Sequence, residues 1–93
     1  MHKMTIPQDD TCLMVNTQEL LNEQGNPGCE VEKSNQEMVL KGDAQSLQGI
    51  KDQLRKKLFE CCREARQEGM GEDFEYHIRG LASLRQLDIL PEQ

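Results

Sequence analysis

The feature that most limits how this chain can fold is a helical pattern of apolar residues through its middle. Apolar side chains recur at intervals of three and four positions, the spacing of one helical face, in Leu47, Ile50, Leu54, Leu58, Cys61 and Ala65. Asp43 precedes the pattern as a candidate N-cap, and Gly69 or Gly71 would end the helix. We therefore predict one unbroken helix over residues 44–67, which at about 1.5 Å per residue is roughly 36 Å long.

Short patterns on both sides of this helix favour β-strands. CEVEK (29–33) and QEMVLKG (36–42) flank a Ser-Asn pair, and they predict either a hairpin or one longer bent strand. After the helix, DFEYHI (73–78) alternates apolar and polar residues as a strand does. LDIL (87–90) predicts a final strand, which Pro91 would stop.

The N-terminal third has weaker patterns. Residues 1–10 mix proline, glutamine and aspartate, and we expect them to form a flexible N-terminus. TCLMV (11–15) is a short apolar run typical of a strand. NTQELLNEQG (16–25) predicts either one or two helical turns, with its first residue as N-cap and its glycine as a stop, or an irregular continuation of the strand. GNPG (25–28) predicts a turn.

Together these elements predict an α+β fold. Residues 11–93 would form a single domain, in which a small, mainly antiparallel sheet of three to five strands packs against one long helix (residues 44–67). A typical strand spans only about 17–20 Å, so the helix should extend beyond the sheet. Its far end then needs another partner, for which a second copy of the protein is one candidate.

Composition and charge favour binding over catalysis. The 93 residues include only three aromatics and have a formal net charge of −6, so the core is thin and an acidic surface repels phosphate. The local exception is residues 44–68, with six bases and four acids. The chain has no 18-residue apolar run, and its first residues lack the apolar region of a signal peptide. We expect a cytoplasmic protein that binds a protein partner, without membrane contact and with nucleic acid as a poor ligand.

The cysteines and histidines do not form a metal-binding pattern. A structural zinc site needs four ligands, usually in closely spaced pairs, and no such pairs occur among His2, Cys12, Cys29, Cys61, Cys62 and His77. Neighbours on a helix point about 100° apart, so Cys61 and Cys62 do not converge on one ion. We expect free thiols, no metal and no cofactor, with Cys61 packed inside the apolar face and Cys62 at its margin.

A second row of residues runs along the same helix. It consists of Arg55, Phe59, Cys62 and Arg66, at intervals of four, three and four. The Phe59 ring lies about 120° from the centre of the apolar face, where we expect it to stay partly exposed. An exposed aromatic ring flanked by arginine is typical of protein interfaces, so this row predicts a partner-binding surface. The alternative is that a sheet edge or the terminal segment covers the ring.

One family resemblance is present. EMVLKGDAQSLQGIKDQL (37–54) has a strand, then Gly-Asp, then a helix that begins with leucine, and FEYHI (74–78) and LDIL (87–90) follow as predicted strands. This order resembles small immunity proteins that neutralise toxins in bacterial polymorphic-toxin systems. The resemblance implies a non-enzymatic binder of one cognate protein, and it transfers no catalytic residue to this chain.

Three functions follow, in decreasing order of support. The first is a small non-enzymatic protein-interaction module, in its narrower form an inhibitor or toxin-immunity protein. The second is a small-ligand-binding or enzymatic α+β domain that acts as a dimer, with Tyr76, His77 and Cys62 lining a pocket between helix and sheet. The third is DNA binding through the long helix, by way of Arg55, Lys56, Arg63 and Arg66.

Overall fold

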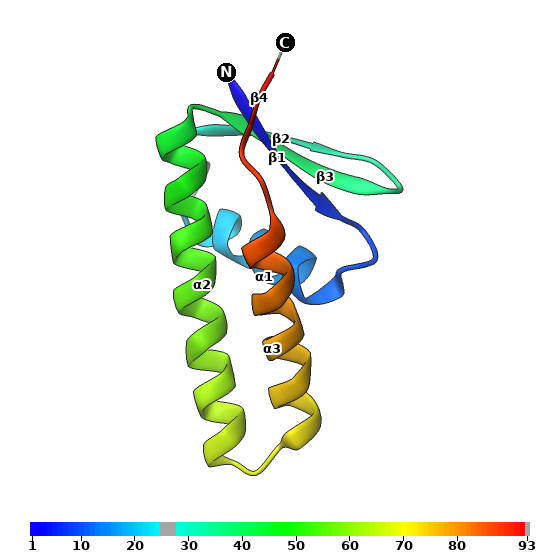
Figure 1. Cartoon of the computed structure of the whole chain (residues 1–93), viewed down its shortest axis with the longest axis vertical. Coiled ribbons are helices and arrows are strands. Elements are labelled where there is room, and N and C mark those ends of the chain that lie inside the picture. The colour runs from blue at the N-terminus through cyan, green and yellow to red at the C-terminus, as the bar shows by residue number, and fades with distance from the viewer. Residues whose placement is uncertain (25–27, 93) are drawn as a thin grey trace.

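The computed structural model describes residues 1–24 and 28–92, in which three helices and four strands are present (Figure 1). The elements follow one another as β1 (His2–Pro7), α1 (Thr11–Gln24), β2 (Cys29–Lys33), β3 (Glu37–Gly42), α2 (Ala44–Gln67), α3 (Gly71–Gln86) and β4 (Leu90–Pro91). The α+β prediction is confirmed, whereas the prediction of one long helix alone on the sheet is wrong. The predicted turn at 25–28 and the predicted stop at Gly25 fall on residues 25–27, outside the described part.

The four strands form one antiparallel sheet with the order β2-β3-β1-β4. Helix α1 connects β1 to β2, and β3 lies between these two strands. Helices α2 and α3 connect β3 to β4, and β1 lies between those two strands. The fold therefore contains two interleaved split β-α-β units, and α1 and α2 both contact the sheet. Each unit therefore has one strand of the other unit between its own two strands: β3 lies between β1 and β2, and β1 lies between β3 and β4.

Strand β1 replaces the predicted flexible N-terminus. It pairs with β3 along its whole length, from His2 opposite Gly42 to Pro7 opposite Glu37. Met4 and Ile6 point toward the helices and have no exposed surface. The prediction of a flexible N-terminus is therefore wrong for residues 2–7. Their Met-Thr-Ile alternation is a strand pattern, but it is short and is followed by polar residues, so it was not recognised.

Helix α1 replaces the predicted strand at 11–15. Its buried residues have helical spacing: Cys12, Leu13, Asn16, Thr17, Leu20 and Leu21. The helix begins after Asp10, whose Oδ1 accepts a hydrogen bond from the backbone N–H of Leu13 at 3.3 Å. Asn16 is therefore not an N-cap; it lies inside the helix, where its side-chain amide donates to the carbonyl of Cys12 at 2.8 Å.

Strands β2 and β3 form the predicted hairpin rather than one bent strand. The turn is held by Ser34, whose backbone N–H donates to the carbonyl of Glu37 at 2.9 Å. The Ser34 hydroxyl oxygen also accepts from the backbone N–H of Glu37 at 3.2 Å. This local side-chain bond lets a Ser-Asn loop close without glycine.

Helix α2 has the predicted bounds, 44–67. Asp43 is the N-cap, because its Oδ1 accepts from the backbone N–H of Ser46 at 2.8 Å. At the other end Gly69 has φ +71°, and its N–H donates to the carbonyl of Arg66 at 3.3 Å. The next N–H, that of Met70, donates to Ala65 at 2.8 Å. These two bonds form a Schellman motif, in which glycine is favoured because φ is positive.

Replacing the cap Asp43 by alanine should lower the melting temperature by a few degrees, since the first turn of α2 would lose its acceptor. Asp43→Asn is the matched control and should keep most of the stability, because its amide oxygen can accept the same bond. The bonds from Ser46 lower the pKa of Asp43, so its contribution is present at neutral pH and is lost as the pH falls through that lowered value. Thermal unfolding followed by circular dichroism measures both variants. Equal melting temperatures for Asp43→Ala and wild type would contradict the cap.

Helix α3 covers the part of α2 that extends beyond the sheet (Figure 1). At about 1.5 Å per residue, the 24 residues of α2 span roughly 36 Å, whereas β3 has only six residues. The prediction that the helix outruns the sheet is confirmed. The expectation that a second copy covers its far end is replaced by an intramolecular contact, since α3 runs back along α2.

This arrangement corrects two strand predictions. Residues 73–78 lie in α3, which packs along α2, and not in a strand. The predicted strand 87–90 is reduced to β4, Leu90–Pro91, which pairs only with His2 and Lys3. Pro91 is part of β4 and does not stop the strand before it. Proline is tolerated there because β4 is an edge strand.

Candidate functional site

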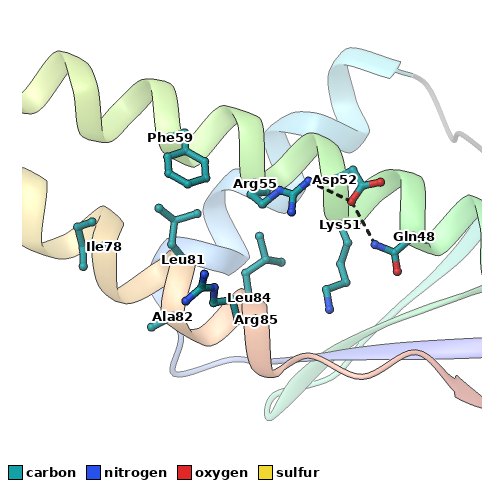
Figure 2. Close-up of a pocket in the computed structure, with 10 residues that line it drawn as sticks. All are labelled: Gln48, Lys51, Asp52, Arg55, Phe59, Ile78, Leu81, Ala82, Leu84 and Arg85. Atoms are coloured by element: carbon teal, nitrogen blue, oxygen red, sulfur yellow. Dashed lines mark hydrogen bonds and ion pairs between the residues drawn. The ribbon is translucent and has the colours of Figure 1, made fainter.

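A groove of about 610 Å³ runs between α2 and α3 on the side away from α1 (Figure 2). Figure 2 shows Phe59 and Arg55 from α2, and Ile78, Leu81 and Arg85 from α3, turned toward the space between the helices. The complete lining of the groove is Gln48, Lys51, Asp52, Arg55, Phe59, Ile78, Leu81, Ala82, Leu84 and Arg85.

The apolar part of the groove includes side chains that the fold leaves in water. Phe59 is 59% exposed and Ile78 is 43% exposed, while Leu84 at the base is buried. Fully burying a phenylalanine side chain contributes about 1.5–3 kcal/mol, so the 59% exposed ring of Phe59 gives up part of that stabilisation. Exposed apolar side chains that gather in a polar-rimmed hollow are typical of binding sites.

The polar part of the groove is basic. It contains three cations, Lys51, Arg55 and Arg85, and one carboxylate, Asp52, so its net charge is +2 in a chain of net charge −6. Arg55 Nη2 lies 3.8 Å from Asp52 Oδ1, a distance too long for a strong ion pair. Lys51 Nζ donates to the carbonyl of Leu87 at 2.6 Å, which holds this ammonium at the edge of the groove.

The predicted row along α2 is only partly brought together. Arg55 and Phe59 line the groove, and Phe59 is exposed as predicted. Cys62 is 5% exposed and packs inside the molecule, so it cannot contact a partner. Arg66 is exposed at the end of α2 and lies outside the groove lining. The row therefore supplies two residues of the site.

The two adjacent cysteines have exchanged their predicted positions. Cys62 is buried and Cys61 is half-buried, the reverse of the expectation. The buried side of α2 is formed by Leu47, Ile50, Leu54, Leu58, Cys62 and Ala65. Beyond the sheet, α2 is covered by α3, and this second cover shifts the buried side by one position at residue 62.

The thiols are poorly suited to nucleophilic or metal chemistry. All four cysteines are free, and burial raises the pKa of each, that of Cys12 to about 11 with help from the Asp10 carboxylate. A raised pKa leaves little of the reactive thiolate at neutral pH. Among residues 1–24 and 28–92, no three histidine, cysteine or acidic side chains gather in a way that could hold a metal ion.

Native-state alkylation tests this assignment of the thiols. At mildly alkaline pH, iodoacetamide should modify the half-buried Cys61 first and Cys12 slowest, because Cys12 is 4% exposed and has its pKa raised to about 11. Peptide mass mapping of timed samples gives the order, and the urea-unfolded chain, in which all four should react at similar rates, is the control. Fast modification of Cys12 in the folded protein would contradict the described packing.

Tyr76 and His77, the candidates for ligand binding, lie on α3 outside the groove lining. His77 Nδ1 is 2.7 Å from the carbonyl of Asp73, so the ring donates its proton within its own helix. The Tyr76 ring meets the His77 ring edge-on at 5.2 Å, and burial raises the pKa of Tyr76, with Cys12 and Asp10 of the α1 end adding to the effect. Tyr76 is 40% exposed, and neither Tyr76 nor His77 shares the groove with Arg55 and Phe59.

The α3 half of the groove was missed at the sequence level. Its residues are Ile78, Leu81, Ala82, Leu84 and Arg85. The sequence pattern placed Ile78 in a strand, and the segment after it was predicted to be a loop or a short helical turn. A longer window would have indicated a helix, because Phe74, Ile78, Leu81 and Leu84 recur at intervals of four, three and three. Glu72 and Asp73 in the first turn are a further helix signal.

Comparison with known proteins adds no relative: no protein-family model, no curated protein and no solved structure matches this chain. Within the described ranges, each helix is too short or too polar to cross a membrane. The groove is thus the feature on which a functional proposal can rest.

Proposed function

We propose that this chain is a non-enzymatic protein-interaction module that binds a partner protein through the groove between α2 and α3. The observation that carries the proposal is the 59% exposure of Phe59 inside a hollow with basic edges. Large aromatic side chains in partly formed pockets often supply most of the binding energy of an interface. Arginine, which flanks this ring on both helices, is also enriched at interfaces.

The side chains available in the groove favour contact over catalysis. Its described lining contains no histidine, cysteine, serine or tyrosine. Of its possible proton carriers, Lys51 donates to the carbonyl of Leu87 and Asp52 accepts from the Gln48 amide. The groove also holds two arginines and one lysine, and its single carboxylate, Asp52, lies near Arg55 and accepts a hydrogen bond from the Gln48 amide. These side chains can bind acidic groups on the surface of a partner protein.

The narrower proposal is that the partner is a toxin that this protein neutralises. It is supported by the family resemblance of residues 37–54, where β3, Asp43 and α2 form the strand–Gly-Asp–helix order. The other part of that resemblance is weaker, since FEYHI (74–78) lies in α3 and not in a strand. Protection of cells against a co-expressed candidate toxin, abolished by Phe59→Ala, tests this form.

Site-specific photo-crosslinking tests the general proposal. A photoreactive phenylalanine analogue at position 59, in the full-length chain expressed in its native cells, should give a discrete adduct with another protein on illumination. Val15 is the matched control position, because it is also an exposed apolar residue, 47% exposed, but lies on α1. No adduct at position 59, or the same adducts from both positions, would refute binding through this groove.

A further inference from the structure

We infer that the groove receives an acidic amphipathic α-helix of the partner. This inference rests on the proposed function and names the chemistry of the segment that would bind. It follows from three properties of the groove: the state of its backbone groups, the sign of its charge and its length.

The walls of the groove favour a helical segment over an extended one. Both walls are helices, α2 and α3, whose backbone N–H and C=O groups are bonded within each helix. An extended segment would find no sheet edge there and would leave its own polar backbone groups unpaired as it displaced water. A helix already pairs its interior backbone groups and leaves only those at its two ends to water or caps. It also packs well against a pair of helices, because its side-chain ridges fit the grooves between theirs.

The charge of the groove selects acidic flanks on that helix. Arg55 lies on the α2 side and Arg85 on the α3 side of a groove whose apolar part includes Phe59 and Leu81 (Figure 2). A helix with leucine or isoleucine on one face can cover the apolar strip and place Asp or Glu at both arginines. An arginine binds a carboxylate through two parallel hydrogen bonds, which adds specificity to the apolar contact.

The length of the groove sets the length of the segment. On α2 the lining runs from Gln48 to Phe59, eleven intervals of about 1.5 Å, or roughly 16 Å. On α3 it runs from Ile78 to Arg85, seven intervals or roughly 10 Å. A helix of about three turns therefore fills it, with anchor residues at positions i, i+3 or i+4, and i+7.

A second copy of this chain fits the groove less well. In a two-fold dimer the same surface meets itself, so two grooves that each hold three cations and one carboxylate would be brought together. The single carboxylate of each groove, Asp52, cannot balance three cations. Like charges brought together across an interface oppose association.

A charge-swap experiment tests the inference. The probes are two synthetic amphipathic peptides of about 14 residues, with the same leucine face and with either glutamate or lysine on its flanks. Fluorescence anisotropy should show that the glutamate peptide binds the wild-type protein and that the lysine peptide binds at least about tenfold more weakly. In the variant R55E/R85E, whose fold is checked by circular dichroism, the preference should reverse. Phe59→Ala should weaken both pairings, while Val15→Ala should leave both unchanged.

The outcomes separate this inference from the proposed function. An unreversed preference, or no binding of the glutamate peptide, would overturn the acidic helix. The module proposal would still stand if position 59 gave its specific photo-adduct. Tighter binding of a single-stranded DNA oligonucleotide than of the glutamate peptide would also overturn the acidic-helix inference, because nucleic acid would then be the preferred ligand. So would a dimer, measured by light scattering, that Phe59→Ala dissociates, because the second copy would then be the occupant.

Discussion

Replacing Ile6 by aspartate should leave most of the protein unfolded at room temperature. Ile6 has no exposed surface, and it lies in β1, which has β3 on one side and β4 at its start on the other. Loss of a buried isoleucine side chain costs about 2–5 kcal/mol, and an unpaired buried carboxylate adds to that cost. The total stability of a domain of this size is only about 5–14 kcal/mol. Most of the variant should therefore already be unfolded without denaturant, and it should show little or no cooperative unfolding transition.

The neighbouring strand position provides a matched control for this prediction. Thr5 points to the opposite face of the sheet and is half-buried, so Thr5→Asp adds the same charge without placing it in the core. Urea unfolding followed by circular dichroism should show a folded protein for Thr5→Asp and little folded protein for Ile6→Asp. If Ile6→Asp unfolded at the same urea concentration as wild type, β1 would not be part of the sheet and residues 1–10 would be flexible.

Replacing Gly80 by alanine should destabilise the protein, although alanine is the better helix former. A Cβ atom at Gly80 would lie 2.5 Å from Cys12 Sγ and 3.2 Å from Cys12 Cβ, with Leu58 Cδ1 at 3.7 Å. Among the described glycines, Gly80 is the one whose added Cβ would come closest to another atom, so α3 packs tightly against Cys12 of α1 here. Overpacking of this kind costs about 1–3 kcal/mol, more than the roughly 1 kcal/mol that alanine gains over glycine in a helix. We expect a net loss of up to about 2 kcal/mol, and a larger loss for Gly80→Val.

A double-mutant cycle identifies the cause of that loss. In a Cys12→Ala background the sulfur is absent, so Gly80→Ala should cost at least about 1 kcal/mol less than in wild type. Gly49→Ala is the control, because a Cβ at Gly49 in α2 meets nothing within 4 Å; it should stabilise the protein by about 0.5–1 kcal/mol. Strict additivity of Cys12→Ala and Gly80→Ala in urea unfolding would refute the close contact of α1 and α3.

The elements predicted correctly are those whose information is local. Helix α2 combines a long periodic face with a cap at Asp43 and a stop at Gly69, so its bounds follow from residues near it in sequence. The β2–β3 hairpin likewise depends on neighbouring residues and on the turn at Ser34. Long, strongly periodic segments are where sequence patterns are most informative.

The elements predicted wrongly depend on distant partners. TCLMV (11–15) is apolar in both a strand and a helix, and only its packing on α3 and the sheet decides for α1. DFEYHI (73–78) alternates over six residues, too short a window to outweigh the helical pattern of the whole segment 71–86. β1 is stabilised by pairing with residues that lie 30 to 40 positions later in the chain, from Pro7 opposite Glu37 to His2 opposite Gly42. Such pairing leaves little mark on its own six residues.

The candidate site was half predicted for the same reason. Phe59 and Arg55 followed from their angle on a correctly predicted helix, and their exposure and position in the groove agree with it. The opposite wall could not follow, because α3 was not recognised as a helix. Cys62 was placed at a surface that α3 covers, and it is buried for that reason.

The most direct test of binding through the α2–α3 groove is the affinity of the cross-linked partner, once purified, for wild type and Phe59→Ala. Isothermal titration calorimetry should show binding weakened at least about 30-fold by Phe59→Ala, the loss of roughly 2 kcal/mol expected of an interface centre. Val15→Ala, on the exposed side of α1, should bind as wild type does. Equal affinities of wild type and Phe59→Ala would show that the exposed ring contributes nothing to recognition and that the groove is not the binding site.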